Sequence, residues 1–295
     1  MKFSFVILVL FNYTIVYGQF SENKTQLQES QLSNLEGASA YISATYVYKK
    51  VGEVCLSLHV YAPVTLSSHH RRPAMLFFHG GGWRTGSPLQ FKEHCIHLAE
   101  RGVVGITAEY RLSPKGKIRI GDCIEDAKSA MRWVRGNAEE LGINPDRICS
   151  SGGSAGGYLA SCTAIMDNFN ANTDDLKICV KPNALVLFNP FLGLPPEQEK
   201  RKLLNYDIAE EEANLVNPLR YASNIQPPCL IFFGTKDNLL SGARLYQYKS
   251  FEAGNNCKIM TYEGQEHGFF NREKYIKLTL IEVDSFLDSL GWQQE

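Results

Sequence analysis

The chain has 295 residues, of which 44% are hydrophobic, and its formal net charge at neutral pH is −1. This length and composition suit one large domain with a buried core. The near-neutral charge balance excludes the basic surface typical of proteins that bind nucleic acid or anionic membranes, and neither is predicted as a partner.

The first eighteen residues have the pattern of a secretory signal. Lys2 supplies a positive start, residues 5–11 form an apolar run, and Val16 and Gly18 stand at the −3 and −1 positions of a cleavage site before Gln19. An uncleaved anchor is the alternative, but the apolar run is short for a bilayer span. We therefore expect a signal peptide at 1–18, a mature domain at 19–295, a secreted or periplasmic location and no stable membrane insertion after cleavage.

From residue 44 onward, short apolar runs alternate with helical patterns. One helix carries Ile124, Ala127, Met131 and Val134 on a single face, and the last helix of the chain repeats this three-and-four spacing. Continuous apolar strands separated by amphipathic helices predict an α/β fold, with a mostly parallel sheet and helices on both faces. The predicted strands are residues 44–49, 55–61, 74–78, 103–109, 147–149, 184–188, 229–233 and 258–262.

No repeat or low-complexity linker divides the chain, so one domain is expected. The segment 192–223 is long and charged and contains proline. It is therefore the candidate for an insertion or cap over a site.

Eight cysteines in an exported chain predict partial disulfide bonding, although Cys149 and Cys162 have the apolar or small neighbours of core residues. Neither a C-x-x-C pair nor a Cys/His spacing suited to zinc is present, so no metal and no cofactor are predicted.

Ser154 lies at the centre of a G-x-S-x-G pattern, Gly152-Gly153-Ser154-Ala155-Gly156. A strand precedes the pattern and a helical run follows it, which is the context of a nucleophile elbow. The tight turn lifts the serine hydroxyl above the sheet edge, and the helix N-terminus favours negative charge there. A phosphate-binding loop is the alternative, but its lysine is missing here.

An HGGGW sequence, residues 79–83, follows the strand at 74–78. Serine hydrolysis creates an oxyanion that needs N–H donors about 3 Å away. One donor is the residue after the nucleophile, here Ala155, and an HGGG-type loop supplies the rest. His79 is then interpreted as a brace for this loop rather than as the catalytic base.

The base and its acid are expected after the serine, in the order acid then histidine. His267 is the one histidine beyond Ser154, and it follows the strand at 258–262. Asp237 follows the strand at 229–233, which is where the acid is expected; Glu266, next to His267, is the alternative.

With these residues in place, the chain resembles the α/β-hydrolase superfamily, and within it the hormone-sensitive-lipase-like carboxylesterases. The resemblance spans residues 75–270 and rests on HGGGW at 79–83, YRLSP at 110–114, GGSAGG at 152–157, GTKD at 234–237 and HGFF at 267–270. It implies an oxyanion hole formed by Gly81, Gly82 and Ala155. Members more often carry GDSAGG, so Gly153 replaces an aspartate here, a change expected to alter polarity beside the serine. The tract at 121–148 also resembles exported bacterial acetyl- and carbohydrate-ester hydrolases.

The resemblance implies a serine carboxylesterase that hydrolyses short-chain esters through an acyl-enzyme, with acetyl esters of carbohydrates among the candidate substrates. The alternatives are an amide-cleaving relative, either a formamidase or an exopeptidase-like hydrolase, and a non-catalytic binding protein with the same fold. Trp83 is a candidate pocket residue, while Phe269 and Phe270 suit a pocket and a core equally well. Tyr110 and Arg111 are expected to be structural.

Overall fold

A computed structural model describes residues 41–64, 71–112, 119–193 and 214–292, together with the backbone of two short strands at 7–10 and 13–16. The predicted signal peptide lies outside the described residues except for those two strands. Residues 19–40 and most of the predicted insertion at 192–223 also lie outside them. Within the described part of the chain, no helix is both long enough and apolar enough to span a bilayer.

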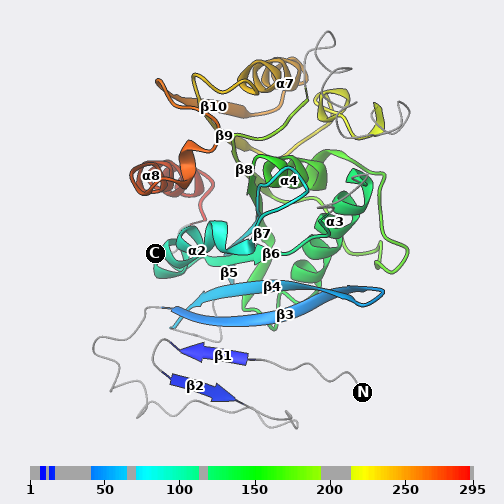
Figure 1. Cartoon of the computed structure of the whole chain (residues 1–295), viewed down its shortest axis with the longest axis vertical. Helices are drawn as coiled ribbons and strands as arrows, with labels where there is room; N and C mark the ends of the chain where they lie inside the picture. Colours follow the sequence, from blue (N-terminus) through cyan, green and yellow to red (C-terminus); the bar gives the residue numbers. More distant parts are fainter. Residues whose placement is uncertain are drawn as a thin grey trace.

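One twisted sheet organises the described residues (Figure 1). Its strand order is β10-β9-β8-β7-β5-β6-β4-β3-β1-β2. Neighbouring strands in the run β10-β9-β8-β7-β5-β6 are all parallel. Strand β4 pairs antiparallel with β6 and with β3. The strands are β1 (Ile7–Leu10), β2 (Tyr13–Val16), β3 (Tyr41–Val51), β4 (Val54–Pro63), β5 (Arg72–Phe78), β6 (Val104–Ala108), β7 (Ile143–Gly153), β8 (Ala184–Phe188), β9 (Cys229–Gly234) and β10 (Cys257–Tyr262).

Helices cover both faces of this sheet, which explains why its central strands are apolar throughout. Helices α2 (Lys92–Glu100) and α8 (Glu273–Ser289) pack on one face. Helices α3 (Ile120–Gly136), α4 (Ala155–Ile165) and α7 (Leu240–Glu252) pack on the other. The predicted α/β class and mostly parallel sheet are confirmed.

Strands β3 to β10 match the eight predicted strands in order, whereas β1 and β2 were not predicted, and β7 differs in length. β7 is eleven residues long and continues to Gly153, whereas the sequence predicted only residues 147–149. Its last residues are serine and glycine, which carry little strand propensity, and pairing with β5 and β8 on either side holds them extended.

The predicted partial disulfide bonding is wrong for this structure, because all eight cysteines are free. Five of them are buried, at positions 95, 123, 149, 162 and 229. Burial raises the pKa of the Cys95 and Cys149 thiols well above the ordinary value, so these residues behave as small hydrophobic groups.

Candidate active site

Ser154 stands in a sharp turn between β7 and α4. Its backbone has φ 53° and ψ −116°, a strained conformation for a non-glycine residue. The turn brings β7 and α4 so close that a Cβ on Gly152 would lie 2.5 Å from the Gly156 carbonyl carbon, and a Cβ on Gly156 would lie 1.9 Å from the carbonyl oxygen of Phe78 at the end of β5. The Ser154 N–H donates to the Phe188 carbonyl at 2.9 Å, which ties the turn to β8. The glycines of the motif are therefore required by close packing.

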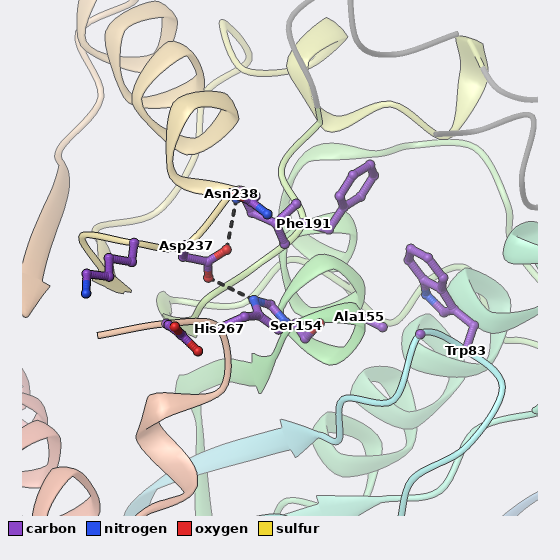
Figure 2. Close-up of a pocket in the computed structure, with 11 residues that line it drawn as sticks. Trp83, Ser154, Ala155, Phe191, Asp237, Asn238 and His267 are labelled. Carbon is purple, nitrogen blue, oxygen red and sulfur yellow. Dashed lines mark hydrogen bonds and ion pairs between the residues drawn. The ribbon is translucent and has the colours of Figure 1, made fainter. Parts of the chain in front are cut away.

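A chain of hydrogen bonds joins Ser154, His267 and Asp237 (Figure 2). His267 Nε2 lies 2.9 Å from Ser154 Oγ, and His267 Nδ1 donates to Asp237 Oδ2 at 2.8 Å. The three residues follow β7, β10 and β9, whose parallel arrangement places their carboxyl ends at one edge of the sheet. The sequence prediction named these residues, and the structure brings them together from 113 positions apart in the chain.

The Asp237 carboxylate is enclosed, with a side chain 1% exposed against 44% for His267. Burial alone would raise the pKa of Asp237, but hydrogen bonds from His267, the Leu239 N–H and Asn189 hold it below its ordinary value. Leu239 N–H donates to Oδ1 at 2.9 Å, and Asn189 Nδ2 donates to Oδ2 at 2.6 Å. The carboxylate is thus fixed in its ionised form. Glu266, the alternative acid, lines the cavity rim instead.

The HGGGW loop forms a tight turn beside the serine. Gly81, Gly82 and Trp83 all have positive φ, at 120°, 61° and 60°. Glycine adopts such angles readily, whereas tryptophan does so rarely. The N–H groups of Arg84 and Thr85 both donate to the Gly81 carbonyl, which closes the turn. Gly82 and Ala155 line the same cavity as Ser154.

His79 braces this loop, as the sequence suggested. Its Nδ1 donates to the Gly80 carbonyl at 2.8 Å, and its ring stacks on Tyr110 with the centroids 4.4 Å apart. The Tyr110 hydroxyl donates to the His79 carbonyl at 2.8 Å. Burial lowers the pKa of His79, opposed in part by the bond to Gly80, which favours a neutral ring at physiological pH.

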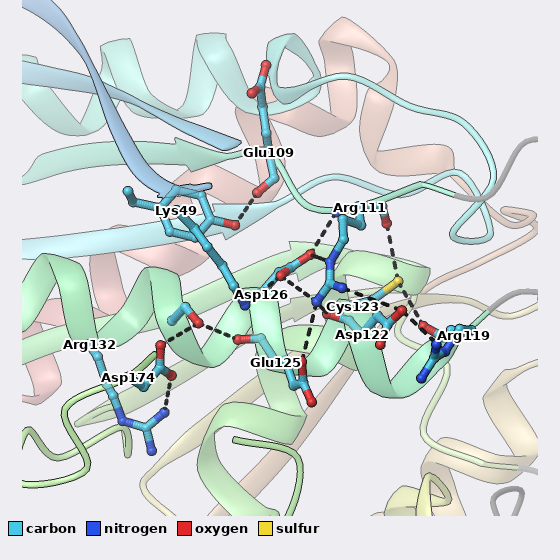
Figure 3. Close-up of polar contacts among 12 residues, drawn as sticks. Lys49, Glu109, Arg111, Arg119, Asp122, Cys123, Glu125, Asp126, Arg132 and Asp174 are labelled. Carbon is cyan, nitrogen blue, oxygen red and sulfur yellow. Dashed lines mark hydrogen bonds and ion pairs between the residues drawn. The ribbon is translucent and has the colours of Figure 1, made fainter. Parts of the chain in front are cut away.

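Arg111, next to Tyr110, belongs to an ion network centred on the buried Asp126 carboxylate (Figure 3). Its guanidinium binds both oxygens of Asp126 at 2.7 and 2.9 Å, and Lys49 reaches the same carboxylate at 2.8 Å. Both Arg111 and Asp126 lie outside the lining of the cavity. The network anchors the segment after β6, so Arg111 has the structural role that was expected.

The cavity above Ser154 has a volume of about 460 Å³, within the range of small-molecule sites. Trp83 packs edge-to-face on Tyr158 and Phe191, with ring centroids 5.3 and 6.1 Å away, and forms an apolar side with Phe191. The lining residues are Gly82, Trp83, Ser154, Ala155, Phe191, Lys236, Asp237, Asn238, Leu239, Glu266 and His267. Trp83 therefore faces the cavity, whereas Phe269 and Phe270 lie in the core.

Phe270 also explains the departure at Gly153. A Cβ on Gly153 would lie 2.4 Å from Phe270 Cζ and 3.2 Å from Phe91 Cζ. The two rings stack, with centroids 5.8 Å apart, and fill the space in which an aspartate would stand. The aromatic rings of Phe270 and Phe91 therefore pack under the serine, where a carboxylate would otherwise stand.

Sequence reasoning missed Asn189, whose amide holds Asp237. It also missed Gln90, whose side-chain oxygen accepts from the Gly80 N–H at 2.6 Å. Neither residue belongs to a motif. The one available signal for Asn189 is its position directly after a buried strand, at the same sheet edge as the triad.

Comparisons with known proteins agree with this geometry. A family model described as alpha/beta hydrolase fold, Abhydrolase_3, matches residues 75–271. An arylesterase of Saccharolobus solfataricus is 24% identical over 260 residues, which cover 82% of this chain and 81% of the arylesterase. Apo esterase 2 of Thermogutta terrifontis is 40% identical with a TM-score of 0.80, and the match covers 86% of this chain and 96% of that one. Mouse carboxylesterase 3B is 33% identical over 118 residues; the chain spans 20% of its length.

Proposed function

Because this chain belongs to the Abhydrolase_3 family, with the alpha/beta hydrolase fold, we propose that it is a serine esterase that hydrolyses short-chain esters through an acyl-enzyme on Ser154. The broader class, a carboxylic ester hydrolase, was predicted from the sequence. Similarity to an arylesterase and to an esterase over most of their lengths confirms that class.

One observation carries the proposed chemistry: the continuous hydrogen bonding from Ser154 Oγ through His267 to Asp237. Nε2 of His267 is positioned to take the hydroxyl proton while Oγ attacks the ester carbonyl carbon. Asp237, held ionised, fixes the tautomer with the proton on Nδ1 and stabilises the imidazolium that forms.

The negative charge that develops on the carbonyl oxygen would be bound by backbone N–H groups. Ala155 N–H stands at the N-terminus of α4, and Gly81 and Gly82 supply donors from the adjacent turn. Collapse of the intermediate breaks the ester C–O bond, and His267 returns the proton to the departing alcohol oxygen. Water activated by His267 then attacks the acyl-enzyme and releases the acid.

A short acyl group fits the apolar side of the cavity. Trp83 is buried and held by aromatic contacts, so it closes that side at a fixed depth. Structures of the Thermogutta esterase have been solved with propionate and with butyrate bound. We therefore propose acyl groups of two to four carbons as the preferred substrates.

A polar alcohol fits the opposite side. The departing alcohol must lie near His267, which protonates it, and this end of the cavity carries Lys236, Asn238 and Glu266. Charged and amide groups at an exposed rim bind hydroxyl groups readily. We propose esters of polyols or sugars, such as acetylated carbohydrates, over esters of long alkyl alcohols.

Three measurements test the assignment of the nucleophile. Wild type should hydrolyse p-nitrophenyl acetate and leave an aminoacyl-anilide intact, and Ser154→Ala should lose at least about 10³-fold in kcat. Paraoxon, which phosphorylates the Thermogutta enzyme, should add one diethylphosphoryl group to wild type and none to Ser154→Ala, as read by intact mass. Unchanged hydrolysis in the alanine variant would refute the assignment of Ser154 as the nucleophile.

Two further measurements test the substrate. An acyl series from acetate to decanoate should peak at short chains, and Trp83→Ala should move the peak to longer ones. Acetylated xylan should be deacetylated faster than hexyl acetate, and Lys236→Met should reduce that preference. A maximum at decanoate in wild type would overturn the short-chain assignment.

We also propose export directed by residues 1–18. Expression of the full chain with its own leader should deliver a protein outside the cytoplasm whose N-terminal residue is Gln19, as determined by mass spectrometry. Retention of Met1 in the exported protein would contradict cleavage at this position.

A further inference from the structure

Asn189 directly follows strand β8 and lies between the serine and the acid. Its backbone N–H donates to the Phe232 carbonyl on β9 at 2.8 Å. The residue before it, Phe188, accepts from the Ser154 N–H at 2.9 Å, and Phe191 N–H donates to the Ser154 carbonyl at 3.3 Å. The short segment after β8 therefore contacts the nucleophile turn on one side and β9 on the other.

The side-chain amide of Asn189 is directed at Asp237. Nδ2 donates to Asp237 Oδ2 at 2.6 Å, and this is the oxygen that accepts from His267 Nδ1. The Leu239 N–H occupies the other oxygen. Rotation of the carboxylate about its side-chain bonds would break one of these contacts, so the Asn189 amide locks the oxygen that orients His267.

Asn189 has two features that lower stability. It is a non-glycine residue with φ 44°, in the left-handed region. Its side chain is fully buried, and Oδ1 has no hydrogen-bond partner within the described part of the chain. Strained backbone conformations and unpaired buried polar atoms are concentrated at functional sites, where the function of the residue offsets its cost in stability.

We propose that Asn189 is a positioning residue for the proposed Asp237–His267 pair: its amide fixes the plane of the Asp237 carboxylate and keeps it ionised. This inference rests on the triad proposed above. It assigns Asn189 no contact with substrate, and its whole effect passes through Asp237.

Asn189→Gly separates this role from a structural one, because glycine accepts a φ of 44° without strain. We expect the melting temperature to stay the same or rise, kcat to fall about 10- to 100-fold, and KM to change less than twofold. Loss of the donor raises the pKa of Asp237, so the acid limb of the pH profile should move to higher pH. Asn189→Asp, which is isosteric but lacks the N–H donor, should be impaired at least as much.

A matched control lies at the other end of the same strand. Asn183 precedes β8 and accepts from the Ile148 N–H and from Arg135, far from the triad in sequence and contacts. Asn183→Gly should lower the melting temperature without moving the acid limb.

A double-mutant cycle with Asp237→Ala decides the question. If Asn189 acts through Asp237, adding Asn189→Gly to Asp237→Ala should change kcat less than twofold. A full additional 10-fold loss, or an unmoved acid limb in Asn189→Gly, would overturn the inference. The kcat of Ser154→Ala, measured beside these variants, tests only whether Ser154 is the nucleophile. A failure of the proposed esterase mechanism can therefore be distinguished from a failure of the Asn189 proposal.

Discussion

Replacing His94 with leucine should stabilise the protein, most strongly in acid. His94 lies on α2 and is 1% exposed, and neither ring nitrogen has a hydrogen-bond partner within the described residues. Its ring is surrounded by Phe77, Phe91 and Phe188, with centroids 6.0, 5.0 and 5.4 Å away. Burial, with a smaller contribution from His97, lowers the pKa of His94 from 6.5 to about 3. The folded protein therefore holds this imidazole neutral.

The sign and size of the effect follow from proton linkage. Because the folded pKa is lowered, the folded state binds fewer protons than the unfolded state between pH 6.5 and 3, so stability falls as the pH falls through that window. Each pKa unit corresponds to about 1.4 kcal/mol. The loss is thus roughly 2 kcal/mol by pH 5 and on the order of 5 kcal/mol by pH 3. Removing the unpaired nitrogens should contribute about 1–3 kcal/mol at neutral pH as well.

Urea unfolding followed by circular dichroism at pH 7 and pH 5 tests this prediction. His94→Leu should be at least as stable as wild type at pH 7, and its advantage should grow by about 2 kcal/mol at pH 5. Equal pH dependence in wild type and His94→Leu would refute the reasoning.

Three further predictions test other features. Gly153→Ala should lower kcat/KM about 10- to 100-fold, because its Cβ would displace Phe270 and with it the nearby His267 loop; an active, stable variant would contradict this. Gly86→Ala should cost about 100-fold in kcat, since its Cβ would lie 2.2 Å from the Gly80 carbonyl and φ is 123°; esterase assays at saturating substrate measure it. Burial lowers the pKa of Lys128 from 10.5 to about 8, so the folded state binds fewer protons than the unfolded state between these pH values. The free energy of unfolding of wild type, relative to Lys128→Met, should therefore rise by up to about 3 kcal/mol from pH 8 to pH 10.5, as measured by urea unfolding.

The sequence predicted the parts of this protein that depend on short-range requirements. A glycine-flanked serine between a strand and a helix, and three glycines after a strand, are steric necessities of the turns they form, so they are visible in a few consecutive letters. Asp237 and His267 were predicted from chain order and from their positions after strands. The mostly parallel sheet followed from unbroken apolar runs separated by amphipathic helices.

Only the tertiary structure decided how distant segments meet. Asn189 holds Asp237 across 48 positions, and Phe270 fills the space beside Gly153, yet neither pair has a local pattern. The roles of Trp83 and Phe270, one lining the cavity and the other in the core, depended on which face of a loop packs inward. Packing contacts and side-chain hydrogen bonds between segments far apart in the chain leave no periodic pattern in the sequence. Which residues become partners depends on how the whole fold places those segments.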